Sequence, residues 1–395
     1  RQRQMCIRDS MVIRPLGSAL FGSLGDRIGR RPVFMITIAL MGGATVCVGF
    51  LPTYAQVGIL APILLVTLRL IQGLSAGGEI GGGAIYLSEH AGNQHRGFRT
   101  SFLQLMGPLG ILASTLQIAL LQQYLSPEEF QSWGWRVPFW ISFFLLLIAF
   151  YIRRSLEETP VFIELTKNSK ENQSQLLNNF RDSEIRKRMF LLFFCISSSG
   201  AILFFCVQVY TAIFLKTSVQ MPPEIVDRLS IFSTLVLFPI TIFAGWLSDR
   251  LGRKPILLSG VLLGALSIYP AFLALELLGN LYVSSSSISA LVGILFILLI
   301  LSAALGLAVG PQSAMLAELF PAKNRNSAAT LPHNLAAGWI GGLLPFFVTI
   351  LNKSFDSTMF GLLYPSFFLI LILVTSVIYL PETASFSLIS KVEKN

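Results

Sequence analysis

An eleven-residue segment occurs twice in this chain, as GSLGDRIGRRP at residues 22–32 and as GWLSDRLGRKP at residues 245–255. Seven of the eleven positions are identical, and Asp26 and Asp249 are separated by an offset of 223 residues. Both copies lie between long apolar runs. A charged loop that is duplicated in this setting predicts two homologous membrane halves. This organisation is typical of secondary transporters, whose substrate passes between the halves.

The composition also indicates a membrane protein. Of the 395 residues, 53% are hydrophobic and only 12% are charged, too few charges to cover a soluble domain of this size. The net charge of +9 comes largely from short loops between apolar segments, so we attribute it to membrane topology and expect no nucleic-acid partner. The four cysteines, Cys6, Cys47, Cys195 and Cys206, lack metal-ligand spacing. We therefore expect free thiols, no metal site and no cofactor.

The apolar runs predict an all-α, polytopic membrane protein. A helix needs about 20 apolar residues to cross the hydrocarbon core of a bilayer. Eleven runs are candidate transmembrane helices: 11–24, 33–51, 57–89, 99–123, 137–153, 188–216, 229–247, 255–276, 287–319, 326–351 and 359–380. The first run would rise only about 21 Å as a helix, which is too short to cross the bilayer alone.

The repeat predicts two bundles of the six-helix type with one helix missing. We expect residues 11–153 to hold helices 2–6, residues 154–187 to form a polar cytoplasmic linker, and residues 188–395 to hold helices 7–12 and a short tail. The offset maps Arg188, where the second half begins, to position −35. The first helix of the first half is therefore expected to be absent. Residues 1–10, RQRQMCIRDS, are polar and lack a helix-start signal, and we interpret them as a foreign leader on a truncated reading frame.

Other repeats place the charged loops on one side of the membrane. Two further sets recur at nearly the same offset: Glu89 with Arg96 as Glu318 with Arg325, and Leu156-Glu157-Glu158-Thr159 as Leu380-Pro381-Glu382-Thr383. Of the 29 Lys and Arg residues, 20 lie on the side of these motifs and four lie on the opposite side. Because cytoplasmic loops are enriched in Lys and Arg, the motifs, the linker and the C-terminus are predicted to be cytoplasmic.

Several strings resemble a known superfamily. The repeated loop resembles the signature GxLxDRxGR(R/K)P of the major facilitator superfamily, and Arg69-Leu70-Ile71-Gln72-Gly73 resembles its fourth-helix motif. More specific strings resemble the metabolite:proton symporter branch, which includes proline/betaine, shikimate, citrate and oxoglutarate carriers: RPLG at 14–17, RLIQGLSAGGEIGGG at 69–83, SEHA at 88–91, WGWRVPFW at 133–140, LEETPVF at 156–162 and AELFP at 317–321. The resemblance covers residues 11 to about 386 and implies the major facilitator fold, alternating access and proton-coupled transport.

Three charged residues lie well inside apolar runs: Arg14, Arg69 and Glu79. A charge at this depth is costly unless it faces a wet cavity or a partner. On a helix, Gln72 and Glu79 lie on the same side as Arg69, but about 15 Å of rise prevents an Arg69–Glu79 bond. We expect Arg14 and Arg69 to hold an anionic group and Glu79 to accept a proton. The alternative is a static set of ion pairs between helices.

Other polar residues in the predicted helices are further cavity candidates: Gln117, Gln208, Tyr210, Gln312, His333 and Asn334. His333 could titrate near neutral pH, although a lone intramembrane histidine beside Asn334 is also typical of packing or hydrogen bonding. Gly73, Gly77 and Gly81 recur at four-residue steps, which predicts close packing against another helix.

The repeated loops predict a gate between the two halves. We expect Asp26 to cap a helix beginning near Asn326, because an anion there meets unpaired N–H groups and the positive end of the helix dipole. Glu89 and Glu318 are expected to pair with basic loop residues, in a network that breaks as the halves rock. The predicted gate contains Asp26, Arg27, Arg30, Arg31, Glu89, Arg96, Asp249, Arg250, Arg253, Lys254, Glu318 and Arg325. The alternative is a charge cluster that only sets topology.

The motifs GxxxxGK(S/T) and HExxH do not occur in the sequence. GLSAG at residues 73–77 matches the pattern GxSxG, but it lies inside a predicted apolar helix rather than at the strand-to-helix turn that a nucleophilic serine needs. We therefore expect no enzyme, no catalytic residue and no ATP-driven transport. The function favoured by the sequence is proton-coupled symport of a small organic anion or zwitterion by a monomer in a bacterial inner membrane. The expected partners are the lipid bilayer, the substrate and the proton. The alternatives are a sugar or drug transporter of the same fold, and a non-transporting sensor or inert fragment.

Overall fold

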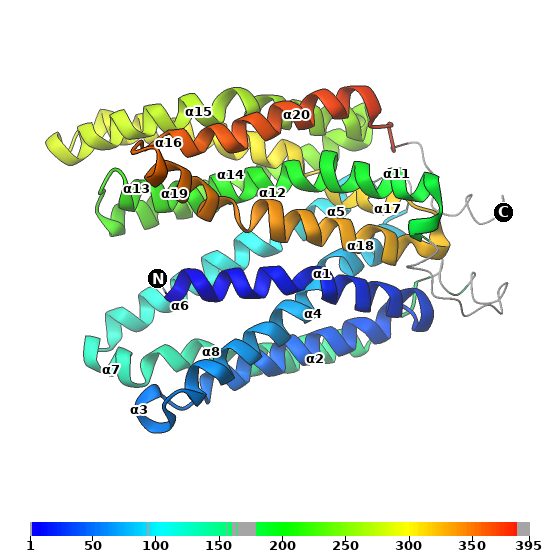
Figure 1. The fold of residues 1–395 in the computed structure, drawn as a ribbon, viewed down its shortest axis with the longest axis horizontal. Helices are drawn as coiled ribbons and strands as arrows, with labels where there is room; N and C mark the ends of the chain where they lie inside the picture. Colours follow the sequence, from blue (N-terminus) through cyan, green and yellow to red (C-terminus); the bar gives the residue numbers. More distant parts are fainter. Residues whose placement is uncertain (1, 93–94, 156, 160–162, 164–178, 385–395) are drawn as a thin grey trace.

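The computed structural model describes residues 2–92, 95–155, 157–159, 163 and 179–384. All regular structure among these residues is helical, and the long helices lie side by side (Figure 1). Ten helices in this part of the chain are long and apolar enough to cross a membrane: Arg30–Gly49, Leu60–His90, Arg96–Tyr124, Gly134–Arg154, Ser183–Thr217, Pro223–Leu251, Arg253–Ser285, Ile288–Glu318, Ala322–Ser354 and Phe360–Tyr379. They coincide with ten of the eleven predicted spans, which confirms an all-α polytopic fold.

The remaining predicted span, 11–24, is part of a longer helix. Helix α1 runs from Gln2 to Ile28 over 27 residues, a length of about 40 Å. The prediction of a short stub beginning at residue 11 was therefore wrong. Residues 2–10 contain neither Gly nor Pro, so their backbone has no strong helix breaker. The origin of this segment stays a prediction.

The N-terminal half continues with seven helical segments of unequal length. They are α2 (Arg30–Gly49), α3 (Tyr54–Val57), α4 (Leu60–His90), α5 (Arg96–Gln104), α6 (Met106–Tyr124), α7 (Pro127–Ser132), and η1 (Gly134–Arg136) followed by α8 (Val137–Arg154). Segments α5 and α6 together form one membrane-length helix. The short helix α7 begins with a capping box in which Ser126 and Glu129 bond each other, and these hydrogen bonds lower the pKa of the exposed Glu129 carboxyl.

In the C-terminal half, π-helical segments interrupt two long α-helices, Ser183–Thr217 and Ala322–Ser354. Its segments are α11 (Ser183–Leu191), η2 (Leu192–Ser197), α12 (Ser198–Phe204), η3 (Phe205–Tyr210), α13 (Thr211–Thr217), α14 (Pro223–Leu251), α15 (Arg253–Ser285), α16 (Ile288–Val309), α17 (Gln312–Glu318), η4 (Ala322–Asn324), α18 (Arg325–Leu335), η5 (Ala336–Gly341), α19 (Leu344–Ser354), η6 (Phe360–Leu362) and α20 (Leu363–Tyr379). Segments η2, η3 and η5 are π-helical. Helix α11 begins inside the predicted linker. Residues 160–162 and 164–178 of that linker lie outside the described residues.

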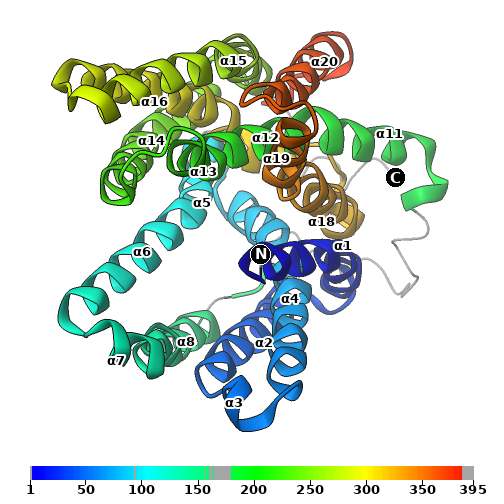
Figure 2. The ribbon, with the colours of Figure 1, turned by 60° about the vertical axis from the view of Figure 1, so that its left-hand side comes forward.

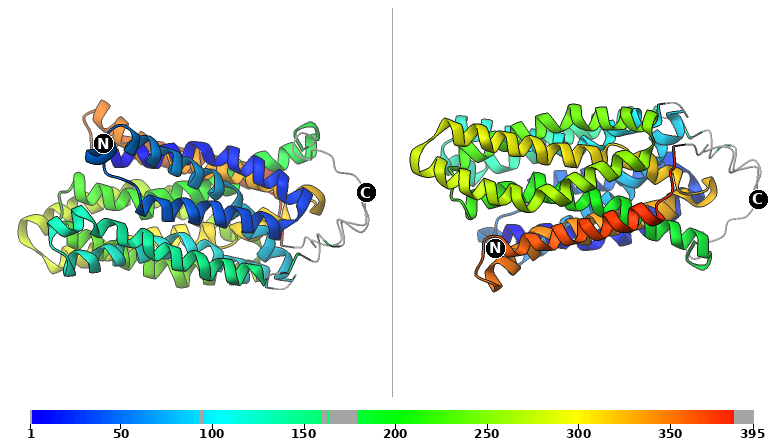
Figure 3. Two further views of the ribbon diagram at one scale, coloured as in Figure 1. Left: turned by 90° about the horizontal axis from the view of Figure 1, so that it is seen from below. Right: turned by 90° about the horizontal axis from the view of Figure 1, so that it is seen from above.

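Two pairs of helices join the halves: α1 packs against α18, and α5 packs against α14 (Figure 2). Helix α4 also contacts α17 and α18 across the same interface. Both repeated loops lie at one end of the molecule, which we call the motif end, whereas α3 and α7 lie at the far end (Figure 3).

Glycines explain how closely these helices approach. A Cβ added to Gly77 of α4 would lie 2.2 Å from the carbonyl oxygen of Arg14 in α1, and one added to Gly81 would lie 2.7 Å from Thr330 Oγ1 in α18. No side chain fits at either position without displacing a neighbour. The predicted close packing of Gly77 and Gly81 is therefore confirmed.

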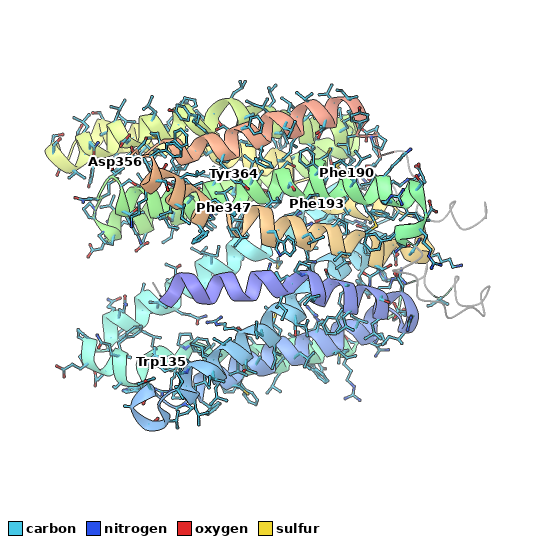
Figure 4. All side chains as sticks on the ribbon, viewed as in Figure 1. Trp135, Phe190, Phe193, Phe347, Asp356 and Tyr364 are labelled. Carbon is cyan, nitrogen blue, oxygen red and sulfur yellow. The ribbon has the colours of Figure 1, made fainter. Side chains whose placement is uncertain are left out.

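The surface of the helices carries many aromatic and aliphatic side chains. Phe190 and Phe347 are exposed, and Phe190 lies nearer the motif end than Phe347 does (Figure 4). Apolar side chains exposed around the circumference of a helical bundle are typical of a lipid-facing surface.

Candidate functional site

Each repeated loop is a tight connection between two long helices. The first joins α1 to α2, and the second joins α14 to α15. Gly29 and Gly252 occupy equivalent positions with φ of 100° and 102°. This backbone conformation strongly favours glycine, which explains why both copies of the loop keep one there.

Asp26 bonds directly to the other half of the molecule. Its carboxylate accepts hydrogen bonds from the backbone N–H groups of Asn326 (3.3 Å) and Ser327 (2.9 Å), in the first turn of α18. These N–H groups have no partner within their own helix, and the helix dipole favours an anion beside them. The predicted contact of Asp26 with this helix is confirmed.

Asp249 makes the equivalent contact in the opposite direction. Its carboxylate accepts hydrogen bonds from the N–H groups of Gly97 and Phe98, both at 2.8 Å, in the first turn of α5. We call these two contacts the crossed caps, because Asp26 and Asp249 each cap a helix of the other half. They lie together at the motif end.

A buried group of ion pairs surrounds the second cap. Glu318, at the end of α17, accepts hydrogen bonds from Arg96 (2.9 Å), Arg253 (3.3 Å) and Thr383 Oγ1 (2.6 Å). Arg253 also pairs with Asp249 at 2.7 Å. Arg96 belongs to the N-terminal half, so its bond with Glu318 crosses the interface. A charge without water is tolerated when it is paired and hydrogen-bonded in this way.

Glu89 occupies the corresponding place beside the first cap. Its Oε1 contacts Arg325 across the interface at 2.8 Å and Arg30 of its own half at 3.5 Å. Its Oε2 is buried and has no hydrogen-bond partner among the described residues. Glu89 therefore accepts fewer bonds than Glu318 does, although both carboxylates are fully buried.

Two further carboxylates belong to this site, although the sequence analysis did not assign them to it. Each accepts hydrogen bonds from the first two backbone N–H groups of the helix that follows a repeated loop, at 2.8–3.1 Å: Glu158 from Arg30 and Arg31, and Glu382 from Arg253 and Lys254. The available signal was the recurrence of LEET as LPET at nearly the offset of the loops.

Four predicted gate residues have side chains that make no bond across the interface in the described part of the chain. Arg27 is exposed, and the guanidinium of Arg250 stacks 4.0 Å from the ring of Trp246. Arg31 and Lys254 donate to backbone carbonyl groups within their own halves. Arg27 and Arg250 each follow a capping aspartate, and one residue along a helix turns a side chain by about 100°. They therefore point away from the interface, whereas Arg31 and Lys254 join the network only through their backbone N–H groups. The gating role of these four residues stays a prediction.

Arg14 lies about halfway along α1, at the interface of the halves. It precedes Ile28, the last residue of α1, by 14 positions, which is about 21 Å of helical rise. Gly77 of α4 packs against the Arg14 carbonyl, and its own carbonyl accepts a hydrogen bond from Asn334. Arg14 therefore lies beside the turn of α18 that holds His333 and Asn334. The Nε of Arg14 is buried and has no hydrogen-bond partner among the described residues. The structure thus brings Arg14 and His333 together.

Two residues of α18 near Arg14, His333 and Asn334, bond to segments η2 and α4. His333 Nδ1 lies 3.0 Å from Ser197 Oγ of η2, and Asn334 Nδ2 donates to the Gly77 carbonyl of α4 at 2.9 Å. The Oδ1 of Asn334 is buried without a hydrogen-bond partner in the described structure. We call Arg14, Gly77, Ser197, His333 and Asn334 the central cluster. Ser197 was not predicted, because the run Ser197-Ser198-Ser199 does not by itself show which hydroxyl faces the other half.

Arg69 lies further toward the far end of α4 and bonds within its own half. Its Nη1 donates to Gln72 Oε1 at 3.1 Å, and Gln72 Nε2 donates to Thr45 Oγ1 of α2 at 2.8 Å. Arg69 Nε is buried without a hydrogen-bond partner. Arg69 and Gln72 therefore lie on one face as predicted.

Glu79 does not join that stripe. Its carboxylate pairs with Arg153 of α8, and Arg153 also lies 5.5 Å from the ring of Phe34. Glu79 therefore joins α4 to α8, the fourth and sixth helices in the predicted numbering, whereas the alternative expected ion pairs among the second, fourth and fifth helices. The helical wheel gave the direction of the side chain but not the helix that lies there.

Three other cavity candidates make their described contacts away from the central cluster, and their role in a cavity stays a prediction. Gln208 bonds Ser233 and Thr234 of α14 and lines a small pocket within the C-terminal half. Tyr210 is buried among aromatic rings, and its hydroxyl accepts from Asn352. Gln117 is partly exposed on α6. By contrast, Gln312 does cross the interface, where its Oε1 accepts from Gln104 of α5 at 3.3 Å.

Comparisons with known proteins agree with this architecture. The sequence profile described as "Sugar (and other) transporter" matches residues 4–194 and 189–392. The chain is 33% identical over 357 residues to the shikimate transporter of Escherichia coli (strain K12), covering 87% of this chain and 76% of that protein. It is 31% identical over 376 residues to the proline/betaine transporter of Salmonella typhimurium (strain LT2), covering 93% and 71%.

Solved structures are similar at the level of the fold. The proton:xylose symporter XylE bound to 6-bromo-6-deoxy-D-glucose has a TM-score of 0.72 at 19% identity, covering 98% of this chain and 88% of that one. The inward-open conformation of XylE from E. coli has a TM-score of 0.62 at the same identity. Together with the sequence matches and the two halves joined at the repeated loops, they establish the family. The chain belongs to the major facilitator superfamily, in the sugar (and other) transporter family, and is a multi-pass membrane secondary transporter rather than an enzyme.

Proposed function

We propose that this transporter carries a small carboxylate or zwitterion together with a proton, by alternating access, across a bacterial inner membrane. The observation that carries the proposal is Arg14, a guanidinium at the interface of the halves whose Nε has no hydrogen-bond partner among the described residues. The names of similar proteins support the substrate class, since shikimate is a carboxylate and proline and betaine are zwitterions.

The charge of Arg14 needs a partner. A guanidinium inside a membrane protein stays charged and is costly unless an anion or water faces it. No ion pair between Arg14 and an acidic side chain is found in the described part of the chain. A substrate carboxylate would supply the missing charge and can accept two hydrogen bonds from one guanidinium. Asn334 and Ser197 would offer further hydrogen-bonding groups at the same level.

Two groups are the best candidates for handling the coupled proton. Protonation of Glu79 would remove its charge from the pair with Arg153, whereas His333 lies beside the proposed substrate-binding Arg14. Of these two groups, Glu79 is the one that belongs to an ion pair between two helices, and its protonation would break that pair. We therefore propose Glu79 as the proton acceptor. His333 then serves as a hydrogen-bonding partner of Ser197.

The crossed caps and their ion pairs are proposed to form the inner gate. They seal the motif end by contacts that must all break when the halves separate. The count of 20 basic residues at this end against four at the far end supports a cytoplasmic motif end and C-terminus. We further propose that a monomer is the transporting unit, since the interface between halves lies within one chain.

The proposal is tested by uptake in cells or vesicles that carry the protein. We expect accumulation of at least one of shikimate, proline, betaine, oxoglutarate and citrate, with substrate-dependent alkalinisation of the medium. The variant Arg14→Gln should lower uptake by about tenfold or more, because it removes the charge that holds the carboxylate. Arg27→Ala is the matched control, since Arg27 is exposed at the end of the same helix.

Other results would replace the proposal. If the protein takes up xylose or a drug, and Arg14→Gln does not change that uptake, the sugar or drug transporter would be favoured. Binding without flux would favour a non-transporting sensor or an inert fragment. If proton movement stays coupled to substrate uptake in Glu79→Gln, Glu79 is not the proton acceptor. The proposed substrate class would not be affected by that result.

A further inference from the structure

We propose that Asn179, at the end of the segment joining the two halves, is a positioning residue for the gate and sets the docking site for Asp26. This inference rests on the proposed gate. It assigns a role to a residue outside the repeated motifs and makes the two crossed caps functionally unequal.

Asn179 is completely buried, although it ends a polar connecting segment. Its Nδ2 donates to Ser327 Oγ at 2.8 Å, and its Oδ1 accepts from Asn324 Nδ2. Asn324 is the N-cap residue of α18 and Ser327 lies in its first turn. The side-chain amide thus bridges the cap of α18 to its first turn.

Ser327 connects Asn179 to Asp26. The backbone N–H of Ser327 donates to Asp26 Oδ2 at 2.9 Å, while its hydroxyl oxygen accepts from Asn179 and its hydroxyl hydrogen is directed to the Asn324 carbonyl at 3.3 Å. The amide of Asn179 therefore fixes the turn whose N–H groups receive the Asp26 carboxylate. A preorganised turn binds the carboxylate at a smaller entropic cost.

Asn179 is held in place by its own neighbours. Asp182 caps α11 by accepting from Glu184 N at 2.8 Å, and Arg186 donates to the Phe180 carbonyl at 3.1 Å. Arg188 donates to the Leu319 carbonyl at 3.0 Å. Asn179 is therefore anchored to the C-terminal half and moves with α18 rather than with Asp26.

The other cap is supported differently in the described part of the chain. The offset of 229 between the Glu-to-Arg repeats maps Asn324 and Ser327 to His95 and Phe98. Phe98 has no hydroxyl group, and the Asp249 carboxylate is held instead by Arg253 at 2.7 Å. One cap is thus supported by an ion pair, and the other is supported by the connecting segment.

The experiment measures opening of the motif end in purified protein. Thr330 of α18 is completely buried against Gly81 of α4, so Thr330→Cys in a cysteine-free background reports separation of the halves by its rate of reaction with a water-soluble polyethylene-glycol maleimide. Asn179→Ala should raise that rate by about fivefold, the effect expected from losing a hydrogen-bonding partner. Lys187→Ala, an exposed change in the same segment, should leave it unchanged.

Two further variants separate the possible failures. Asp26→Asn should raise the rate whenever the gate exists; if it does and Asn179→Ala does not, Asn179 has no role and the gate stands. If neither variant changes the rate, the proposed gate and this inference both fail. The reaction rate of the double variant Asn179→Ala with Ser327→Ala should be no higher than that of Ser327→Ala alone, because both changes act through the Ser327 hydroxyl. If the two changes raise the rate independently, Asn179 does not act through Ser327. Size-exclusion profiles of all variants show that they remain folded.

Discussion

The two halves of this transporter carry the same charged loops but bury their helices to different extents. In the C-terminal half, 67% of the most apolar stretch of Ser183–Thr217 is buried, and the other five helices range from 33% to 50%. In the N-terminal half the values fall from 33% for Arg30–Gly49 to 11% for Arg96–Tyr124 and 0% for Gly134–Arg154.

The difference teaches that duplicated sequence motifs fix local contacts without fixing the packing around them. The helix Ser183–Thr217 contacts α14, α16 and α18, and the loop offset maps it to positions before residue 1. In the described part of the N-terminal half, α6 and α8 keep most of their surface uncovered. At the motif end, by contrast, both halves supply one cap and one buried glutamate.

The strongest test of this local equivalence is neutralisation of the crossed caps. We expect Asp26→Asn and Asp249→Asn each to lower uptake at least about tenfold, because the amide brings no charge to the helix N-terminus and offers one acceptor oxygen instead of two. Uptake of the transported substrate and the amount of inserted protein are measured together, and the latter should not change. Loss of transport in only one variant would show that the two copies of the loop are not equivalent.

A smaller effect should distinguish the two buried glutamates. Glu318 accepts from three side chains and Glu89 from two, so Glu318→Gln should cost about 3 kcal/mol of stability and exceed Glu89→Gln by about 1 kcal/mol. Thermal unfolding in detergent measures both. Glu184→Gln, at an exposed i,i+4 pair, serves as the control. Equal losses would mean that the extra donors to Glu318 contribute nothing.

The smallest expected effect concerns the first glycine of each loop. A Cβ on Gly245 would lie 2.6 Å from the Gly97 carbonyl oxygen, whereas one on Gly22 would lie 3.2 Å from Ser327 Cα. Gly245→Ala should therefore destabilise the protein by about 2 kcal/mol and Gly22→Ala by less than about 1 kcal/mol. Gly43→Ala meets no atom within 4 Å and controls for helix propensity. A larger destabilisation by Gly22→Ala than by Gly245→Ala would contradict this expectation. It would mean that α5 and α14 can move apart to make room for the methyl group, whereas α1 and α18 cannot.

Much of the fold was predictable because its determinants are local in sequence. Length and hydrophobicity located ten helices, eight of them to within five residues at each end, whereas the spans 229–247 and 255–276 were too short by up to six and nine residues at one end. The repeat identified the motif end. The contact of Asp26 with α18 could also be predicted, since a duplicated acidic residue in a loop is stabilised at a helix N-terminus and few N-termini were available at that end.

The failures have a common physical cause. Helical periodicity gives the direction of a side chain around its own axis, but the neighbour in that direction is set by tertiary packing. Glu79 therefore pairs with Arg153, and Tyr210 packs among aromatic rings. Residues such as Ser197 and Asn179 gain their roles only from where distant segments meet, which neither composition nor spacing encodes.

The crossed caps also determine what opening does to the solvent. While the motif end is closed, four backbone N–H groups bind the two aspartates. When the halves part, those N–H groups and the buried carboxylates must each bind water instead, so the open form takes up water that the closed form excludes. Solutes that are excluded from protein surfaces will favour the closed form. If the motif end is the proposed gate, release of cargo there depends on the water activity of the compartment that receives it.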